Sequence, residues 1–255
     1  MRSSLGIGFL ALAWTAHGQA WPAFEVASVK PSTDAETTIG MRLYPGGRLT
    51  ITHATLHDLI GDAYHVPAFQ VVGGPKWSDD DEFSVVAKPP AISASSRITP
   101  ANPRTAPPEE ERLMLRELLA ARFQLKLHPE KRDGTVYVLK VGEHGPRLQA
   151  PKDREMFPVL WGRGGSGRPD SMDGHNVSMA LLAERLEREL ERPVKDQTGL
   201  KDAYDFFFEY EGDEAAGKAG PPLTRAVEKL GLRLVKQKGL IEYLVIDHAE
   251  RRSGN

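Results

Sequence analysis

One order of strand-like and helix-like patterns occurs twice along the 255 residues, and this repetition constrains the fold more than any other feature. In the first half, apolar and polar residues alternate over Arg48–Thr52, which predicts a strand. Thr55 is suited to cap a helix with Asp58 three residues on, and apolar residues then recur at helical spacing up to Tyr64. A strand followed directly by a helix therefore opens the first unit.

The first unit continues with two short strands, a second helix and a final pair of strands. Acidic residues followed by regularly spaced leucines predict the second helix, from Glu109 to Phe123. Residues 131–134 are typical of a turn, so we expect the final pair to form a hairpin around them. The four strands are expected at Phe69–Val72, Phe83–Ala87, Gln124–His128 and Thr135–Val141.

The second half has the same order of elements. Ser178 is suited to cap a helix whose apolar residues extend to Leu190, and another helix is expected at Leu223–Leu230. A closing hairpin is predicted around Lys238 and Gly239. The strands of this half are expected at Pro193–Asp196, Tyr204–Tyr210, Leu232–Lys236 and Glu242–His248.

The closing units of the two halves match by residue number. Phe123, Leu125 and Leu127 correspond to Leu230, Leu232 and Leu234 at an offset of 107, and Tyr137–Leu139 corresponds to Tyr243–Val245 at 106. Two copies of one unit explain this offset, although common αββ units can also agree by chance. We therefore predict an α+β fold of two similar lobes, each ordered strand-helix-strand-strand-helix-strand-strand, with helices packed on a mainly antiparallel sheet. The expected bounds are 21–149 for the first lobe, 150–170 for a Pro- and Gly-rich linker or loop, 171–250 for the second lobe and 251–255 for a tail.

The first 20 residues have the features of a secretory signal peptide. Arg2 precedes an apolar run over Leu5–Trp14, and Gly18 and Ala20 are the small residues of a cleavage site. We expect an exported protein, periplasmic or secreted, cleaved near Ala20. A buried helix or an uncleaved anchor are the alternatives. The absence of cysteine in the sequence is compatible with an oxidising compartment.

Charge and hydropathy exclude two classes of partner. The 33 Lys and Arg residues are balanced by 35 Asp and Glu residues, giving a net charge of -2, so the overall basic charge of a nucleic-acid binder is missing. No later stretch is long and apolar enough to predict a membrane span in the mature chain.

Short motifs for known chemistry are weak. His53 and His57 have the spacing of zinc ligands on a helix, but the intervening residues lack the Glu that serves as a base. The glycines of residues 162–168 lack the Gly-Lys-Ser/Thr of a phosphate loop, and the acidic turn at 79–82 lacks the spacing of a calcium loop. We therefore expect no catalytic residue, metal or cofactor on the basis of motifs.

Trp77 is the residue that most suggests binding. It follows the tight turn of Gly73, Gly74 and Pro75, where a large aromatic ring can stack on a sugar or anchor a partner. Trp77, Gly73 and Gly74 are the predicted binding residues, with a core role for Trp77 as the alternative.

Seven ordered blocks of the sequence resemble the soil-associated family of exported proteins of unknown function. The resemblance covers about residues 22–250 and implies export and one family domain over the mature chain, with no established activity, ligand or catalytic residue. Some relatives carry this domain attached to membrane metallopeptidases, which implies a sensing or partner-binding role in the envelope. The blocks are Phe24–Ser32, Leu56–Tyr64, Gly73–Trp77, Leu113–His128, Val136–Leu139, Val194–Leu200 with Tyr204–Phe206, and Leu244–His248.

Two functions follow as expectations. The first is a non-enzymatic periplasmic or secreted binding module, with an envelope protein or a glycan as its partner, since exposed sheet edges bind partners readily. The second is a cell-envelope hydrolase whose site assembles only in space, for instance from His57, Asp58 and Asp196.

Overall fold

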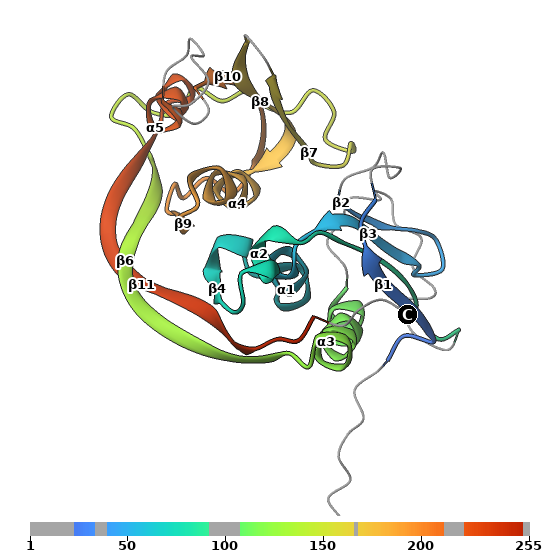
Figure 1. Cartoon of the computed structure of the whole chain (residues 1–255). Coiled ribbons are helices and arrows are strands. Elements are labelled where there is room, and N and C mark those ends of the chain that lie inside the picture. The colour runs from blue at the N-terminus through green and yellow to red at the C-terminus, as the bar shows by residue number, and fades with distance from the viewer. Residues whose placement is uncertain (1–22, 34–39, 92–107, 166–167, 212–221, 252–255) are drawn as a thin grey trace, which may run out of the picture.

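The computed structural model has an α+β fold, as the sequence predicts, and it describes residues 23–33, 40–91, 108–165, 168–211 and 222–251. The predicted signal peptide, residues 1–20, lies outside the described residues, as does the predicted tail except Arg251. Two of the three sheets, with their helices, lie near the two ends of a long curved ribbon of two strands, which itself forms the middle of the third sheet (Figure 1). No helix within the described ranges is long and apolar enough to cross a membrane.

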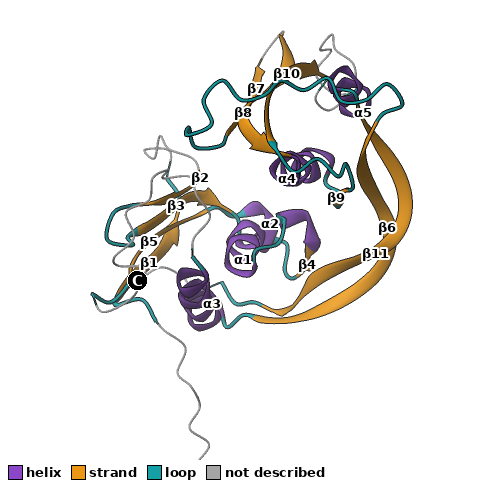
Figure 2. Ribbon diagram, turned by 180° about the vertical axis from the view of Figure 1, so that it is seen from behind, coloured by secondary structure: helices purple, strands orange, loops and turns teal. Residues whose placement is uncertain are grey.

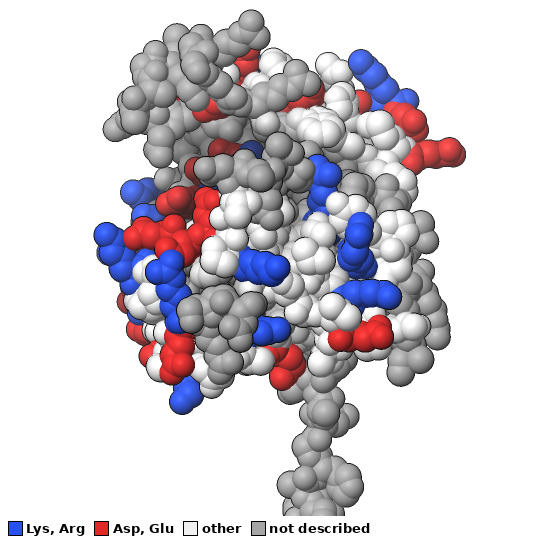
Figure 3. Space-filling view, turned by 45° about the vertical axis from the view of Figure 1, so that its right-hand side comes forward, with Lys and Arg blue, Asp and Glu red and all other residues white. Residues whose placement is uncertain are grey.

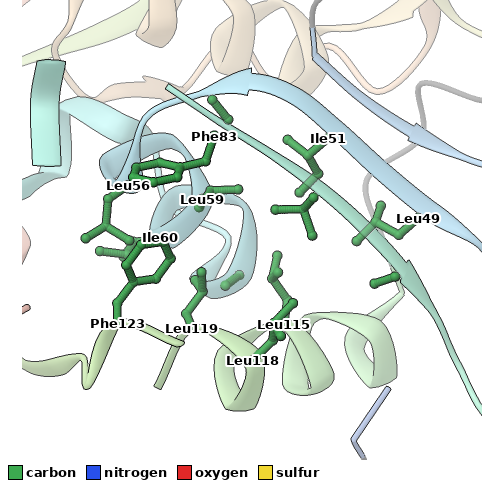
Figure 4. Packing of buried hydrophobic residues seen from close by; sticks show 14 of the residues in the cluster. Leu49, Ile51, Leu56, Leu59, Ile60, Phe83, Leu115, Leu118, Leu119 and Phe123 are labelled. Atoms are coloured by element: carbon green, nitrogen blue, oxygen red, sulfur yellow. The ribbon is translucent and has the colours of Figure 1, made fainter. Parts of the chain in front are cut away.

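The first lobe is a four-stranded antiparallel sheet with helices on one face. Alternate residues of its strands point inward and pack against helices α1 and α3, forming the first core (Figure 4). The strand order is β1-β5-β3-β2. The elements are β1 (Val26–Pro31), β2 (Gly40–Leu43), β3 (Leu49–Ala54), β5 (Phe83–Lys88), α1 (Leu56–Tyr64) and α3 (Glu109–Phe123).

Helix α1 begins where the sequence predicts. The Thr55 side chain accepts a hydrogen bond from the backbone N–H of Asp58, and the Asp58 carboxylate accepts from the backbone N–H of Thr55 at 2.9 Å. This reciprocal pair satisfies two of the N–H groups that a helix start leaves unpaired. Ser178 caps the corresponding helix of the second lobe by accepting from the N–H of Leu181.

The second lobe is a three-stranded antiparallel sheet in the order β10-β8-β7, with helices against its inner face. Strand β7 lies within the predicted linker, residues 150–170, so part of that segment is sheet and not a connection. The strand forms because its consecutive residues pair in register with β8 over 159–163, despite the glycines. The elements are β7 (Val159–Gly165), β8 (Arg168–Ser178), β10 (Ala203–Tyr210), α4 (Met179–Leu190), α5 (Leu223–Ala226) and η4 (Val227–Leu230).

The two predicted hairpins are wrong, because each is one continuous strand. Strand β6 (Lys126–Val141) pairs antiparallel with β11 (Leu232–His248) over nearly the whole length of both. Figure 2 shows the two strands side by side as a curved ribbon that reaches both lobes. One further strand pairs in parallel with each strand of the ribbon. Strand β4 (Val71–Gly73) pairs with β11, and β9 (Val194–Asp196) pairs with β6. Strand β4 follows the 3-10 turn η1 (Ala68–Gln70).

The glycines that suggested turns have another physical role in the ribbon. Gly134 and Gly239 lie directly opposite each other. A Cβ atom on Gly134 would lie 2.5 Å from Cδ1 of Ile241, and one on Gly239 would lie 3.0 Å from Cγ2 of Val136. Each glycine therefore leaves room for a buried side chain of the opposite strand, which is a known use of glycine within strands.

The ribbon joins the two cores. Leu139 of β6 belongs to the second core, whereas Ile246 of β11 belongs to the first. Each lobe is therefore completed by a strand from the other half of the sequence, and the boundary at residues 150–170 does not separate two independent cores. The order of β3, α1, β4 and β5 in the first lobe corresponds to that of β8, α4, β9 and β10 in the second lobe. Duplication of one unit stays a prediction.

Candidate functional site

Trp77 packs against the first core. It begins the short helix α2 (Trp77–Asp80), which forms where the sequence suggested an acidic loop, and its ring stacks on Phe123 with ring centroids 6.0 Å apart and meets the edge of Phe83 at 6.2 Å. Gly73 and Gly74 precede it with φ values of 80° and 83°, which favour glycine. This is the core position that the sequence left open as the alternative for Trp77, and a binding role for the three residues stays a prediction.

A serine, a histidine and an aspartate meet beside this turn. The Nδ1 atom of His57 lies 2.9 Å from Oδ1 of Asp79, and its Nε2 atom lies 3.3 Å from Oγ of Ser78 and 3.2 Å from the carbonyl oxygen of Gly73. Helix α1 supplies His57, and helix α2 supplies the other two side chains. The order of the three groups matches that of a serine nucleophile with its base and orienting acid.

Burial gives this cluster a structural role. Ser78 is 0% exposed, and its hydroxyl donates to the carbonyl oxygen of Pro75 at 2.6 Å. The serine proton is thus already in use, and a substrate carbonyl has no access to Oγ. The cluster holds the turn between β4 and α2 against helix α1.

The other residues of the hydrolase expectation are engaged locally. Asp58 caps helix α1, as described above. Asp196 accepts hydrogen bonds from the backbone N–H of Thr198 at 2.9 Å and from its hydroxyl at 2.8 Å. Neither Asp58 nor Asp196 is a partner of His57, because the His57 ring contacts Asp79, Gly73 and Ser78.

An aromatic surface lies instead on the outer face of the β10-β8-β7 sheet. Trp161 of β7 and Phe207 of β10 both pair in register with Asp173 of β8, so the three side chains share one face and form one row. Phe207 is 58% exposed and Trp161 is 44% exposed. Large apolar side chains in such positions mark sites of interaction more often than single scattered ones. We call Trp161, Asp173, His175 and Phe207 the aromatic face.

A histidine and two aspartates interact beside this row. His175, two residues from Asp173 on β8, has its Nε2 atom 3.3 Å from the Asp173 carboxylate and its Nδ1 atom 3.9 Å from that of Asp205. Asp205 accepts backbone N–H bonds from Asn176 at 2.8 Å and Lys152 at 3.1 Å.

The pKa of Asp205 is lowered overall. Burial acts to raise it, but the backbone bonds from Asn176 and Lys152 and the nearby positive charges outweigh that effect. The face thus combines two aromatic rings, an imidazole and carboxylate groups.

The pairing of β8 with β10 is irregular near Asn176, whose side chain holds the loop that precedes β7. Asn176 has a φ of 54°, and its side-chain amide donates to the carbonyl oxygens of Met156 at 2.6 Å and Arg154 at 3.3 Å. Phe157, next in the loop, is 57% exposed. Asn and Asp tolerate this left-handed conformation better than most residues, which explains the residue type at this position.

The aromatic face was missed from the sequence, although a signal for it exists. Residues 206–208 are three consecutive phenylalanines in one strand, and side chains alternate between faces. With Phe206 and Phe208 in the second core, Phe207 must point outward. Trp161 gave no such signal, because it lies in the segment that was predicted to be a linker.

Among the described residues, no group of three His, Cys, Asp or Glu side chains is arranged to hold a metal ion. Glu111 of α3 is a buried carboxyl outside these clusters: it is 0% exposed, and neither of its oxygens has a hydrogen-bond partner.

Comparison with known proteins identifies the family. No curated protein and no solved structure matches the chain. One family profile, described as "Protein of unknown function (DUF3738)", matches residues 57–249, which include the second lobe and the whole ribbon but not strands β1, β2 and β3 of the first lobe. The match agrees with the expected family of unknown function, whereas the soil association stays a prediction. The chain belongs to the DUF3738 family.

Proposed function

We propose that this protein is an exported, non-enzymatic binding module that holds a carbohydrate chain of the cell envelope on its aromatic face. The observation that carries the proposal is the row of Trp161, Asp173 and Phe207, in which two exposed rings lie on either side of a carboxylate. The features of residues 1–20 support export.

The chemistry of the row suits a sugar. Neighbouring strands lie about 4.8 Å apart, so the two rings are separated by roughly 10 Å across β8, a distance that a disaccharide can bridge. Aromatic rings offer apolar faces against which the C–H groups of a sugar ring pack. The carboxylate of Asp173 accepts hydrogen bonds from hydroxyl groups, and the imidazole of His175 can donate or accept one.

Phe207→Ala tests the proposal. We expect it to weaken binding of soluble peptidoglycan fragments or of an envelope oligosaccharide about 10- to 30-fold, because an aromatic anchor of a binding site contributes roughly 1.4–2 kcal/mol. Titration calorimetry of the purified protein measures the change. Leu240→Ala is the matched control, because Leu240 is 63% exposed but lies on the ribbon.

Three results would contradict the proposal. The first is no saturable binding to any glycan of the envelope. The second is unchanged affinity in Phe207→Ala, and the third is an equal loss in Leu240→Ala. Saturable binding of a protein to the aromatic face would show that the partner of this face is a protein and not a carbohydrate.

A hydrolase is the second candidate, favoured by the contact of Ser78, His57 and Asp79. For Ser78 to act, its hydroxyl must leave the carbonyl of Pro75 and reach solvent. We expect no turnover of ester, peptide or phosphoester substrates, and a loss of about 1–2 kcal/mol of unfolding free energy in Ser78→Ala, because a buried hydrogen bond is lost. Turnover that Ser78→Ala abolishes would establish the hydrolase and overturn the binding proposal.

A further inference from the structure

The four strands of the first-lobe sheet contain lysine and arginine but no Asp or Glu, and the nearby Glu82, which precedes β5, pairs with His53. The register places Arg42, Thr50, Val86 and Ser28 in one row across the four strands. Val26 lies opposite Lys88 at one end of the sheet. We call Val26, Lys30, Arg42, Arg48, Val86 and Lys88 the basic face.

The cations of this face are available to a partner. Lys30, Arg48 and Lys88 are exposed, and Arg42 is partly exposed. None of the four forms an ion pair with a residue in the described ranges, in contrast to many other Lys and Arg side chains of the protein. Lysine and arginine side chains gather over this side of the molecule in Figure 3, with uncharged residues between them.

Apolar and aromatic groups lie among the cations. Val26 is 62% exposed and Val86 is 50% exposed, although most other valines of the sheet point into the core. Arg48 lies over the ring of Tyr44, 4.3 Å from its centroid, in the turn between β2 and β3. Tyrosine is enriched where proteins meet the boundary between water and lipid.

We propose that the basic face docks on the anionic phospholipid headgroups of a membrane surface. The sheet carries four cations on one face, and an anionic leaflet increases the affinity by about 5-fold for each Lys or Arg near its surface. The two exposed valines favour a lipid surface over a soluble polyanion, because apolar side chains gain from contact with the acyl boundary and gain nothing from phosphate groups in water. The overall charge of -2 does not oppose this attraction, because acidic groups elsewhere are screened beyond about 10 Å.

Partition between vesicles tests the proposal. The full protein is mixed with phosphatidylcholine vesicles that contain either 30% or no phosphatidylglycerol, at about 0.1 M salt. The quantity measured is the ratio of the two partition coefficients. Any contribution of the N-terminal apolar residues to binding of neutral lipid cancels in this ratio. We expect a ratio well above 1 that falls toward 1 in 1 M salt.

The double variant Lys30→Gln, Lys88→Gln is expected to lower this ratio about 25-fold, since two attractions of about 5-fold each are removed. The control is Lys195→Gln with Lys229→Gln, two exposed lysines of the second half, for which we expect an unchanged ratio. Circular dichroism confirms that both double variants fold. Phe207→Ala should also leave the ratio unchanged, so failure of the carbohydrate proposal is distinguishable from failure of this one.

Several outcomes would overturn the membrane proposal. They are a wild-type ratio near 1, an equal decrease in the control, and an unchanged ratio in Lys30→Gln, Lys88→Gln. Binding of heparin that depends on Lys30 and Lys88, without selective binding to anionic vesicles, would assign the face to a soluble polyanion instead.

Discussion

Glu111→Gln is expected to raise the free energy of unfolding by about 3 kcal/mol at pH 8 and to change it little at pH 5. Glu111 is 0% exposed on helix α3, and neither of its carboxylate oxygens has a hydrogen-bond partner. Burial, together with the charge of Glu110, raises the pKa of Glu111 to about 7. A buried carboxylate without a partner is costly, and a neutral amide of the same shape removes that cost.

The sign of the pH dependence follows from proton binding. In the unfolded chain, Glu111 loses its proton near its ordinary pKa of 4.5, whereas the folded protein keeps it to about pH 7. The folded state therefore binds more protons between these values, and stability falls as the pH rises through this window. A shift of this size corresponds to about 3 kcal/mol, at roughly 1.4 kcal/mol per pKa unit.

Two half-buried carboxyls add to the effect in the wild-type protein. The pKa of Asp62 on α1 is raised to about 7, mainly by burial and by Asp58, and that of Glu187 on α4 is raised to about 7, mainly by burial and by Glu184. Arg188 of α4 offsets part of both shifts, so the charges of helices from the two lobes act on each other. Glu111→Gln should therefore reduce the slope of stability against pH without abolishing it.

Thermal unfolding at pH 5 and pH 8 measures this difference. An increase of about 3 kcal/mol corresponds to roughly 6–12 °C in the Tm of a protein of this size. Glu117→Gln is the matched control, because Glu117 lies on the same helix but is exposed. A Tm of Glu111→Gln at pH 8 equal to that of the wild type, or an equal increase in Glu117→Gln, would contradict the argument.

Local signals in the sequence predict several of the elements correctly, whereas β1, β2, α2, β7 and β8 were not predicted. The caps at Thr55 and Ser178 and the alternation in β3, β5 and β10 depend on residues only a few positions apart, and the structure confirms them. Helix α3 also has its predicted bounds. These signals suffice because capping and side-chain alternation are properties of the local backbone.

Pairing over long distances is what the sequence does not reveal. A glycine beside a charged residue in a strand pattern predicts a turn when only neighbours are considered. At Gly134 and Gly239, the decisive contacts come instead from Ile241 and Val136 on the opposite strand, about 100 residues away. The role of Trp77 was likewise undecided, because contact with Phe83 and Phe123 requires the tertiary fold.

Leu139→Ala is expected to lower the stability of both lobes together by about 2–5 kcal/mol. Leu139 is 0% exposed in the second core, and loss of a buried leucine side chain combines lost burial with a cavity. Its strand, β6, pairs with β11 along the ribbon, and the far end of β11 places Ile246 in the first core. Unfolding of the second lobe releases the ribbon, and the first core then loses its packing against β11.

Hydrogen exchange measured by mass spectrometry distinguishes this shared ribbon from two independent lobes. In denaturant, Leu139→Ala should reduce the protection of α1 in the first lobe as much as that of α4 in the second, with one unfolding transition for both. Leu119→Ala, a substitution in the first core, should likewise reduce the protection of α1 and α4 by equal amounts. Leu240→Ala is the control on the ribbon itself and should change stability by less than about 0.5 kcal/mol, because the side chain is exposed. Loss of protection confined to the lobe that carries the substitution would show that the strands can separate between the cores, and the cooperative role of the ribbon would be wrong.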